Sequence, residues 1–189
     1  MDILKQLIRQ QGKLMSNDTL QMDAFLNHQV DPQLMVEIGN EFARRFRESN
    51  ITKVLTIESS GIAVAFTTAL ALGVPLVFAR RKKTLTTDGD VWCERVPSFT
   101  KGIVTDILVS KSVLSSSDRV LMIDDIIANG DAARGLIRIL ERSGAELAGV
   151  GVVVEKSFQA GARTIREQGI RFESIVAIKS LSNGAIEFE

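Results

Sequence analysis

Two adjacent carboxylates, Asp124 and Asp125, end a run of four apolar residues in the segment VLMIDDIIANGDAARG at residues 120–135. Such a run is typical of a strand buried on both faces of a parallel sheet, where an unpaired charge is costly. We therefore expect both aspartates at the carboxyl end of the strand and not inside it. Two carboxylates at such a point can hold Mg²⁺ or accept hydrogen bonds from the hydroxyl groups of a sugar.

Three segments that follow predicted strands are suited to phosphate. Residues 58–61 (ESSG) and 124–132 are small-residue loops that open helices, so their backbone N–H groups can point at an anion that the helix dipole also favours. Residues 80–83 (RRKK) supply positive charge. Because ligands of open parallel sheets gather outside the carboxyl ends of the strands, the three segments predict one ligand with phosphate groups in two places and a diol between them.

Two common phosphate-binding motifs are absent from the sequence. No G-x-G-x-x-G opens any predicted helix, which disfavours a dinucleotide cofactor. No G-x-x-x-x-G-K-[ST] loop is present for a nucleoside triphosphate. The acidic pair therefore needs another explanation.

The elements that must position these residues alternate between strand and helix. We predict strands at residues 53–57, 74–79, 106–110, 120–123 and 147–154, with two closing strands around the turn at residues 183–184. We predict helices at residues 32–48, 61–72, 132–143 and 162–168, after a first helix at the N-terminus. This alternation predicts an α/β fold with a mostly parallel sheet and helices on both faces. Residues 84–105 lack periodicity and are interpreted as a hairpin, a lid or a binding loop.

Composition favours one domain over residues 1–189 and excludes several classes of protein. The 189 residues are 45% hydrophobic, and 23 basic side chains cancel 23 acidic ones, so no global field would hold the protein on nucleic acid or an anionic membrane. Cys93 is the only cysteine, which excludes an internal disulfide and a cysteine-based metal cluster. With no signal peptide and no stretch long enough to span a bilayer, we expect a cytoplasmic protein.

The segment VLMIDDIIANGDAA resembles the phosphoribosyl-diphosphate signature of the type I phosphoribosyltransferases. The resemblance covers the whole chain, because five segments occur in the order and spacing of the bacterial xanthine phosphoribosyltransferases: SNDTLQMDAFLNHQVDP, ITKVLTIESSGIA, GVPLVFARRKK, VLMIDDIIANG and GVGVVVEKSFQ. Many type I enzymes carry threonines in the phosphate loop. This chain has Asn129, Asp131 and Ala132 there, as the xanthine subfamily does, which favours that subfamily over the adenine and orotate enzymes.

The resemblance implies a fold and a reaction. The fold is a mostly parallel twisted sheet with helices on both faces, plus a small hood that binds the base and is built from residues 1–50 and 156–189. The reaction is the displacement of pyrophosphate from 5-phosphoribosyl 1-diphosphate by xanthine, with Mg²⁺ accompanying the diphosphate. The family also implies a homodimer, with no nucleic acid or membrane as partner.

The resemblance also assigns roles to particular residues. Asp124 and Asp125 would be catalytic and face the ribose, directly or through Mg²⁺ and its water, with no confident direct metal ligand. The 5′-phosphate would be held by Ala128, Asn129, Gly130, Asp131 and Ala132. The pyrophosphate would be held by Ser59, Ser60, Gly61 and Arg80, the last from the same or the neighbouring subunit. Xanthine would be contacted by Leu20, Asn27 and Lys156, with Phe158 as a stacking surface. Residues 84–105 would close over the site and exclude water.

Each of these features also has an ordinary structural explanation. Adjacent acids after a strand are typical of a capped turn, and a run such as residues 80–83 is typical of a solvated surface. Lys156 can be a surface lysine at the end of a strand, and Asn27 can cap a loop. The combination favours a site. A functional alternative is a regulator that keeps the fold and binds the ligand without turnover. The zero net charge and the short segment before the first strand of the sheet favour the enzyme, and release of pyrophosphate discriminates between the two.

Overall fold

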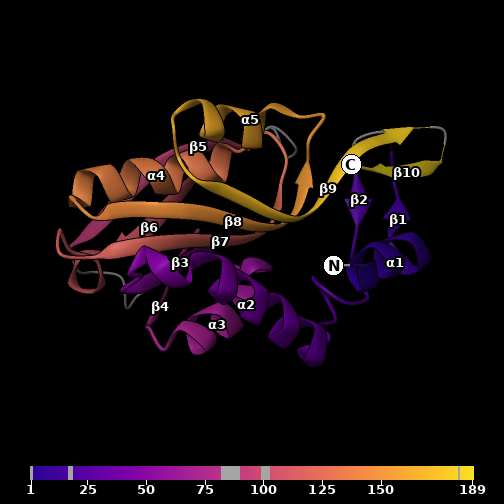
Figure 1. Cartoon of the computed structure of the whole chain (residues 1–189). Helices are drawn as coiled ribbons and strands as arrows, with labels where there is room; N and C mark the ends of the chain where they lie inside the picture. Colours follow the sequence, from indigo (N-terminus) through magenta and orange to yellow (C-terminus); the bar gives the residue numbers. More distant parts are fainter. Residues whose placement is uncertain (1, 17–18, 82–89, 99–102, 183) are drawn as a thin grey trace.

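The centre of the computed structural model is a six-stranded sheet (Figure 1). The structure describes residues 2–16, 19–81, 90–98, 103–182 and 184–189. Within these residues the strands of the sheet are β3 (Lys53–Ile57), β4 (Leu76–Ala79), β7 (Arg119–Ile127), β8 (Glu146–Lys156), β9 (Phe172–Ser182) and β10 (Ala185–Phe188), in the order β10-β9-β8-β7-β3-β4. Each neighbouring pair is parallel except β10 with β9. The predicted mostly parallel sheet is confirmed.

Helices cover both faces of this sheet (Figure 1). The helices are α2 (Pro32–Phe46) and α3 (Gly61–Leu72) on one face, and α4 (Asp131–Ser143) and α5 (Ala160–Glu167) on the other. Side chains of β7 alternate between the faces, as a strand requires. Leu121 and Ile123 pack in the core with α2 and α3, whereas Val120 and Met122 pack in the core with α4 and α5.

The ends of the helices follow the signals in the sequence. Asp31 caps α2, because its Oδ1 accepts a hydrogen bond from the N–H of Leu34 at 3.1 Å, and Pro32 occupies the first helical turn. α3 and α4 stop at Gly73 and Gly144, as predicted. A short 3₁₀ turn, η1 (Arg47–Ser49), continues α2.

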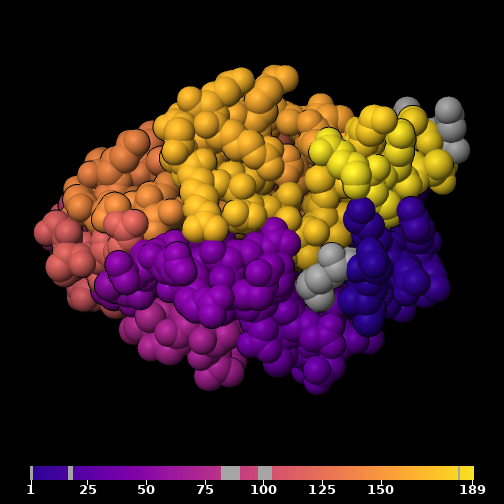
Figure 2. All heavy atoms as spheres, in the orientation of Figure 1, coloured from indigo at the N-terminus to yellow at the C-terminus, as the bar shows by residue number. Residues whose placement is uncertain are grey.

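The two ends of the chain lie together at one end of the molecule (Figure 2). The N-terminal part contains α1 (Asp2–Gln11) and a small antiparallel pair, β1 (Lys13–Leu14) with β2 (Leu20–Gln21). The Lys5 ammonium donates to the backbone oxygen of Glu189 at 3.0 Å, and Arg9 lies 5.0 Å from the ring centre of Phe188. These contacts join the first helix to the last strand of the sheet.

A hairpin outside the main sheet packs on α4. Its strands are β5 (Val91–Ser98) and β6 (Ile103–Ser110), followed by the 3₁₀ turn η3 (Lys111–Val113). Glu94 accepts from Arg138 of α4 at 2.7 Å, and Val96 and Ile107 are buried in the core shared with that helix. The hairpin interpretation is confirmed for these residues. Parts of the predicted lid, residues 84–89 and 99–102, lie outside the described residues.

The position predicted for the two aspartates was wrong. β7 does not end before them but runs on through Asp124 and Asp125 to Ile127. On one side the ladder with β8 continues to the end of the strand, whereas on the other side the ladder with β3 stops at Met122. The strand can carry acids there because, beyond Met122, it borders a cavity instead of another strand.

Candidate active site

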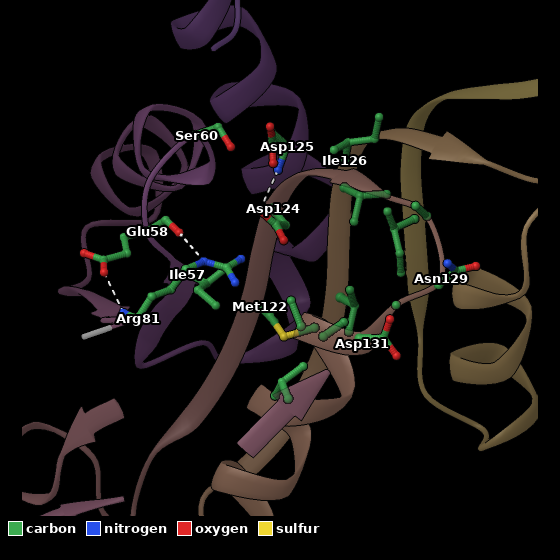
Figure 3. A pocket seen from close by; sticks show the side chains of 18 of the residues that line it. Ile57, Glu58, Ser60, Arg81, Met122, Asp124, Asp125, Ile126, Asn129 and Asp131 are labelled. Carbon is green, nitrogen blue, oxygen red and sulfur yellow. Dashed lines mark hydrogen bonds between the residues drawn. The ribbon is translucent and has the colours of Figure 1, made fainter. Parts of the chain in front are cut away.

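The cavity beside β7 has a volume of about 290 Å³ and gathers residues from each of the three phosphate-suited segments. Asp124 lies near its centre, with Glu58 and Arg81 on one side and Asn129 and Asp131 on the other (Figure 3). It is further lined by Ile57, Ser60, Val96, Pro97, Met122, Asp125, Ile126, Ile127, Ala128, Gly130, Ala132, Ala133, Val150 and Val152. The structure therefore brings the predicted segments together around one hollow.

The carboxylate pair is the main electrostatic feature of this cavity. Asp125 is buried, and its backbone N–H donates to Oδ1 of Asp124 at 2.9 Å (Figure 3). Burial first, and then the charge of Asp125, raises the pKa of Asp124 well above its usual value, while the charge of Arg81 has a smaller effect in the opposite direction. The site thus favours a proton, a cation or a hydroxyl donor next to Asp124.

The loop that opens α3 is packed tightly against Asp124. A Cβ on Gly61 would lie 2.6 Å from Oδ1 of Asp124 and 2.5 Å from Oγ1 of Thr56, so a larger residue would force these side chains to shift. The Thr56 hydroxyl is buried and has no hydrogen-bond partner among the described residues. Ser60 lines the cavity and Ser59 is exposed, with a cis peptide bond between Glu58 and Ser59.

The basic run after β4 sends one arginine into the cavity and one away from it. The Arg81 backbone N–H donates to Oε1 of Glu58 at 2.5 Å, and its Nε donates to the Glu58 carbonyl at 3.2 Å (Figure 3). Arg80 does not line the cavity. It lies 3.5 Å from a Glu58 carboxylate oxygen and stacks 5.0 Å from the ring centre of Phe78.

Arg81 and Glu58 lie in segments that the sequence singled out, but no role was assigned to either residue. The sequence does indicate that only one of the two arginines, Arg80 and Arg81, faces the ligand, because successive side chains of an extended segment point in opposite directions. The sequence does not say which of the two faces the ligand. Lys83, another basic residue of the run, lies outside the described residues.

The loop before α4 presents backbone donors to the cavity. Gly130 adopts φ 80° as the helix cap, and Arg134 fixes the loop by donating to the Asn129 carbonyl at 2.7 Å and to Oδ1 of Asp131 at 2.5 Å. In the described structure the N–H groups of Asn129, Asp131 and Ala132 have no acceptor within the protein. Together with the positive end of the helix dipole they form a site for an anion.

The residues expected to contact a base lie elsewhere. Leu20 is buried in the core near the chain ends, and Lys156 is buried as the last residue of β8. Asn27 is exposed, and its Nδ2 donates to Oδ1 of Asp23 at 2.9 Å. Phe158 is 40% exposed. None of these four residues lines the cavity around Asp124.

The described residues contain no group of three or more histidine, cysteine, aspartate or glutamate side chains arranged to hold a metal ion. They also contain no helix that is both long and apolar enough to cross a membrane.

Comparisons with known proteins agree with this geometry. A family model described as phosphoribosyl transferase domain matches residues 29–178. The chain is 57% identical over 187 residues to the xanthine phosphoribosyltransferase of Moorella thermoacetica, covering 99% of this chain and 95% of that protein. It is 53% identical over 188 residues to the protein of that name from Bacillus thuringiensis, covering 100% and 95%.

Among solved structures, the chain resembles the adenine phosphoribosyltransferase of Giardia lamblia in complex with 9-deazaadenine. The TM-score is 0.77 at 23% identity, over 89% of this chain and 94% of the other. A second match is the adenine phosphoribosyltransferase of Saccharomyces cerevisiae, with a TM-score of 0.73 at 22% identity over 93% and 99%. At these identities the structures show a shared fold.

Proposed function

Because the chain belongs to the phosphoribosyltransferase family, we propose that it transfers the 5-phosphoribosyl group of 5-phosphoribosyl 1-diphosphate to xanthine. The products are xanthosine 5′-monophosphate and pyrophosphate. The observation that carries the chemistry is the cavity in which a carboxylate pair lies between two small-residue loops that open helices. The relatives at 53–57% identity, which match nearly the whole chain, support xanthine as the base.

The carboxylate pair provides the main electrostatic contribution to the reaction. As the bond from the anomeric carbon to the diphosphate breaks, positive charge develops on the ribose ring. Asp124 and Asp125 are held in a largely buried strand and need little rearrangement to face that charge, so they stabilise the transition state more than the ground state. Their oxygens also accept hydrogen bonds from the two ribose hydroxyls.

The same pair suits Mg²⁺ bound to the diphosphate. Mg²⁺ commonly uses one or two carboxylates together with substrate phosphates and water, and Asp124 and Asp125 provide two carboxylates at the cavity. The ion would neutralise the leaving diphosphate. The residues would hold it directly or through its water molecules.

The two loops divide the phosphates between them. The N–H groups of the loop at residues 128–132 would hold the 5′-phosphate, which anchors the ribose. The loop at residues 59–61, with Arg81 beside it, would hold the pyrophosphate, and Ser60 offers a hydroxyl donor. Anchoring both ends of the substrate aligns the breaking bond with the incoming base.

Base selection would depend on the hood formed by the two ends of the chain. Lys156 donates to a purine carbonyl, Asn27 both donates and accepts, and Leu20 and Phe158 provide apolar contacts. Adenine has an amino group where xanthine has a carbonyl, so it would present a hydrogen-bond donor to the Lys156 ammonium, which is itself a donor. This mismatch between two donors is the physical basis for rejecting adenine.

A second copy of the chain would complete the pyrophosphate site. α3 is apolar except for Thr67 and Thr68, a composition that is typical of a helix covered on most sides. Phe66 is nevertheless 57% and Leu70 68% exposed, and Phe78 on the edge strand β4 is 39% exposed. We propose a homodimer through this surface, in which Arg80, next to Phe78, reaches the partner's diphosphate. Sedimentation of the wild type and of Phe66→Asp tests this: a dimer that becomes a monomer supports it, and a monomeric wild type contradicts it.

The direct test of function measures the release of pyrophosphate from 5-phosphoribosyl 1-diphosphate in the presence of Mg²⁺. Xanthine, guanine, hypoxanthine and adenine are offered in parallel. Fastest release with xanthine and none with adenine would support the reaction and the base site. Fastest release with another base would keep the reaction and overturn the assigned specificity. Binding of 5-phosphoribosyl 1-diphosphate without any release would indicate a ligand-binding regulator.

A further inference from the structure

We propose that Gly161, at the start of α5, is a positioning residue that holds the phosphate loop at residues 128–132 in its binding conformation. This inference rests on the proposed function of that loop. Gly161 does not line the cavity, and the sequence assigned no role to it individually. It acts from behind the loop, through its backbone.

The contact between Gly161 and the loop is backbone against backbone. The Gly161 N–H donates to the Ala128 carbonyl at 3.0 Å. A Cβ on Gly161 would lie 2.4 Å from that carbonyl oxygen, 2.7 Å from the N of Gly130 and 2.9 Å from the carbonyl carbon of Asn129. A Cβ on Gly130 would in turn lie 2.9 Å from the Cα of Gly161. Neither side can yield by rotating a side chain.

Backbone conformation does not explain a glycine at position 161. Its φ lies outside the left-handed region, and within a helix alanine is favoured over glycine. The close approach to the loop does explain it. Since the Ala128 carbonyl is occupied by Gly161, the loop is fixed from behind while the N–H groups of Asn129, Asp131 and Ala132 have no acceptor in the described protein.

The far end of α5 is fixed as well. Arg166 donates two hydrogen bonds to the buried carboxylate of Glu155, at 2.6 and 2.7 Å, and Ser174 donates a third at 2.8 Å. Glu155 is on β8 and pairs with Ile127, the last residue of β7 before the loop. α5 is therefore anchored to the strand pair that leads into the loop, which makes it a rigid support.

The test is direct titration of the full-length wild type and Gly161→Ala with two probes, ribose 5-phosphate and pyrophosphate, by calorimetry. The added methyl must displace residues 128–130, so we expect the affinity for ribose 5-phosphate to fall about tenfold, equivalent to about 1.4 kcal/mol. Pyrophosphate contacts the other loop, and its affinity should change by less than about twofold. Equal losses for both probes, or no loss for ribose 5-phosphate, would overturn the proposal.

Two further variants separate positioning from general instability. Gly39→Ala is the matched control, because its Cβ would lie 2.6 Å from Thr67 at the contact between α2 and α3 and so crowds a helix away from the loop. It should lower the melting temperature without the selective loss of affinity for ribose 5-phosphate that is expected for Gly161→Ala. Arg166→Lys keeps the charge but loses the paired hydrogen bonds, so it should weaken ribose 5-phosphate binding in the same direction, by about threefold.

Failure of the role proposed for Gly161 can be distinguished from failure of the proposed function, because the titrations measure binding and need no turnover. A wild type that binds neither probe would contradict the proposed function itself. A wild type that binds ribose 5-phosphate as tightly as Gly161→Ala does would contradict only the role of Gly161.

Discussion

The phosphate cavity and the hood are built in different ways. Around the cavity, two glycines allow close packing: Gly61 lies against the side chains of Thr56 and Asp124, and Gly161 lies against the backbone of residues 128–130. In the proposed hood, the candidate base contacts are individual side chains on separate segments, such as exposed Asn27 and buried Lys156.

The difference indicates which part of the molecule can change during evolution. A tightly packed site tolerates few substitutions, and we assign the cavity to the part of the reaction that is independent of the base. A site made of separate side chains can change its partner by substitution, because replacing one side chain leaves the fold intact. We therefore expect substitutions in the cavity to affect turnover, and those in the hood to affect the choice of base.

The largest effect is expected for Asp124→Asn. Turnover should fall by about a hundredfold or more, because one carboxylate facing the developing charge is lost. Stability should rise: burial and Asp125 raise the pKa of Asp124 in the folded state, so ionising it opposes folding. The melting temperature at pH 8 should increase by about 2–4 °C, and this gain should disappear as the pH falls below about 4, where the unfolded carboxyl is also protonated.

Asp118→Asn is the matched control, because Asp118 directly precedes β7, the strand that carries Asp124. Burial opposes ionisation of Asp118, but hydrogen bonds from Lys53 and Ser115 outweigh it and lower its pKa. Asp118 therefore stabilises the fold above the unfolded pKa of about 3.9 and stops doing so as the pH falls through its folded pKa. Its replacement should lower stability at pH 8 and leave turnover near the wild-type rate. An equal loss of turnover in both variants would contradict a catalytic role for Asp124.

The next effect in size is expected for Gly61→Ala. The new methyl would collide with the Asp124 carboxylate and the Thr56 hydroxyl, so Asp124 must move. We expect kcat to fall roughly tenfold, with a smaller change in the KM for xanthine. Steady-state kinetics with each substrate varied in turn measures both. A rise in the KM for xanthine with kcat unchanged would break the separation between cavity and hood.

The hood is tested by Lys156→Met, which keeps the apolar stem and removes the donor. We expect the KM for xanthine to rise roughly tenfold, consistent with loss of a hydrogen bond from a charged group, while the KM for 5-phosphoribosyl 1-diphosphate stays within about twofold. Asn27→Ala should act in the same direction by a smaller factor, since its amide is exposed and can exchange with water. A parallel rise in both KM values would contradict the assignment of Lys156 to the base.

The sequence alone was sufficient for the parts of the site that are local in the chain. A buried strand, two acids and a small-residue loop before a helix are contiguous, so residues 124–132 could be recognised and the parallel sheet followed from the alternation of elements. The sequence could not show which of Arg80 and Arg81 faces the cavity, because that depends on how the extended segment is rotated. Gly161 was missed because its contact with Ala128 joins segments far apart in the chain, and an isolated glycine in a helix has no sequence signal of its own.

The smallest effect is expected for Glu155→Gln, which tests whether adjacent residues of β8 serve different regions. Glu155 packs with α5 behind the phosphate loop, whereas Lys156 is assigned to the base. Burial opposes ionisation of Glu155, but hydrogen bonds from Arg166 and Ser174 outweigh it and lower its pKa. Its charge therefore stabilises the folded state above the unfolded pKa of about 4.3, and the contribution is lost as the pH falls through the folded pKa.

Glu155→Gln should accordingly lower the stability at pH 7 by about 1–2 kcal/mol, and the difference from the wild type should close below about pH 4. Denaturant unfolding at several pH values measures this. If the two regions are separate, the KM for 5-phosphoribosyl 1-diphosphate should rise slightly and the KM for xanthine should not change. A change in the KM for xanthine alone would mean that Glu155 also orients Lys156. The boundary between cavity and hood would then not fall between these two residues of β8.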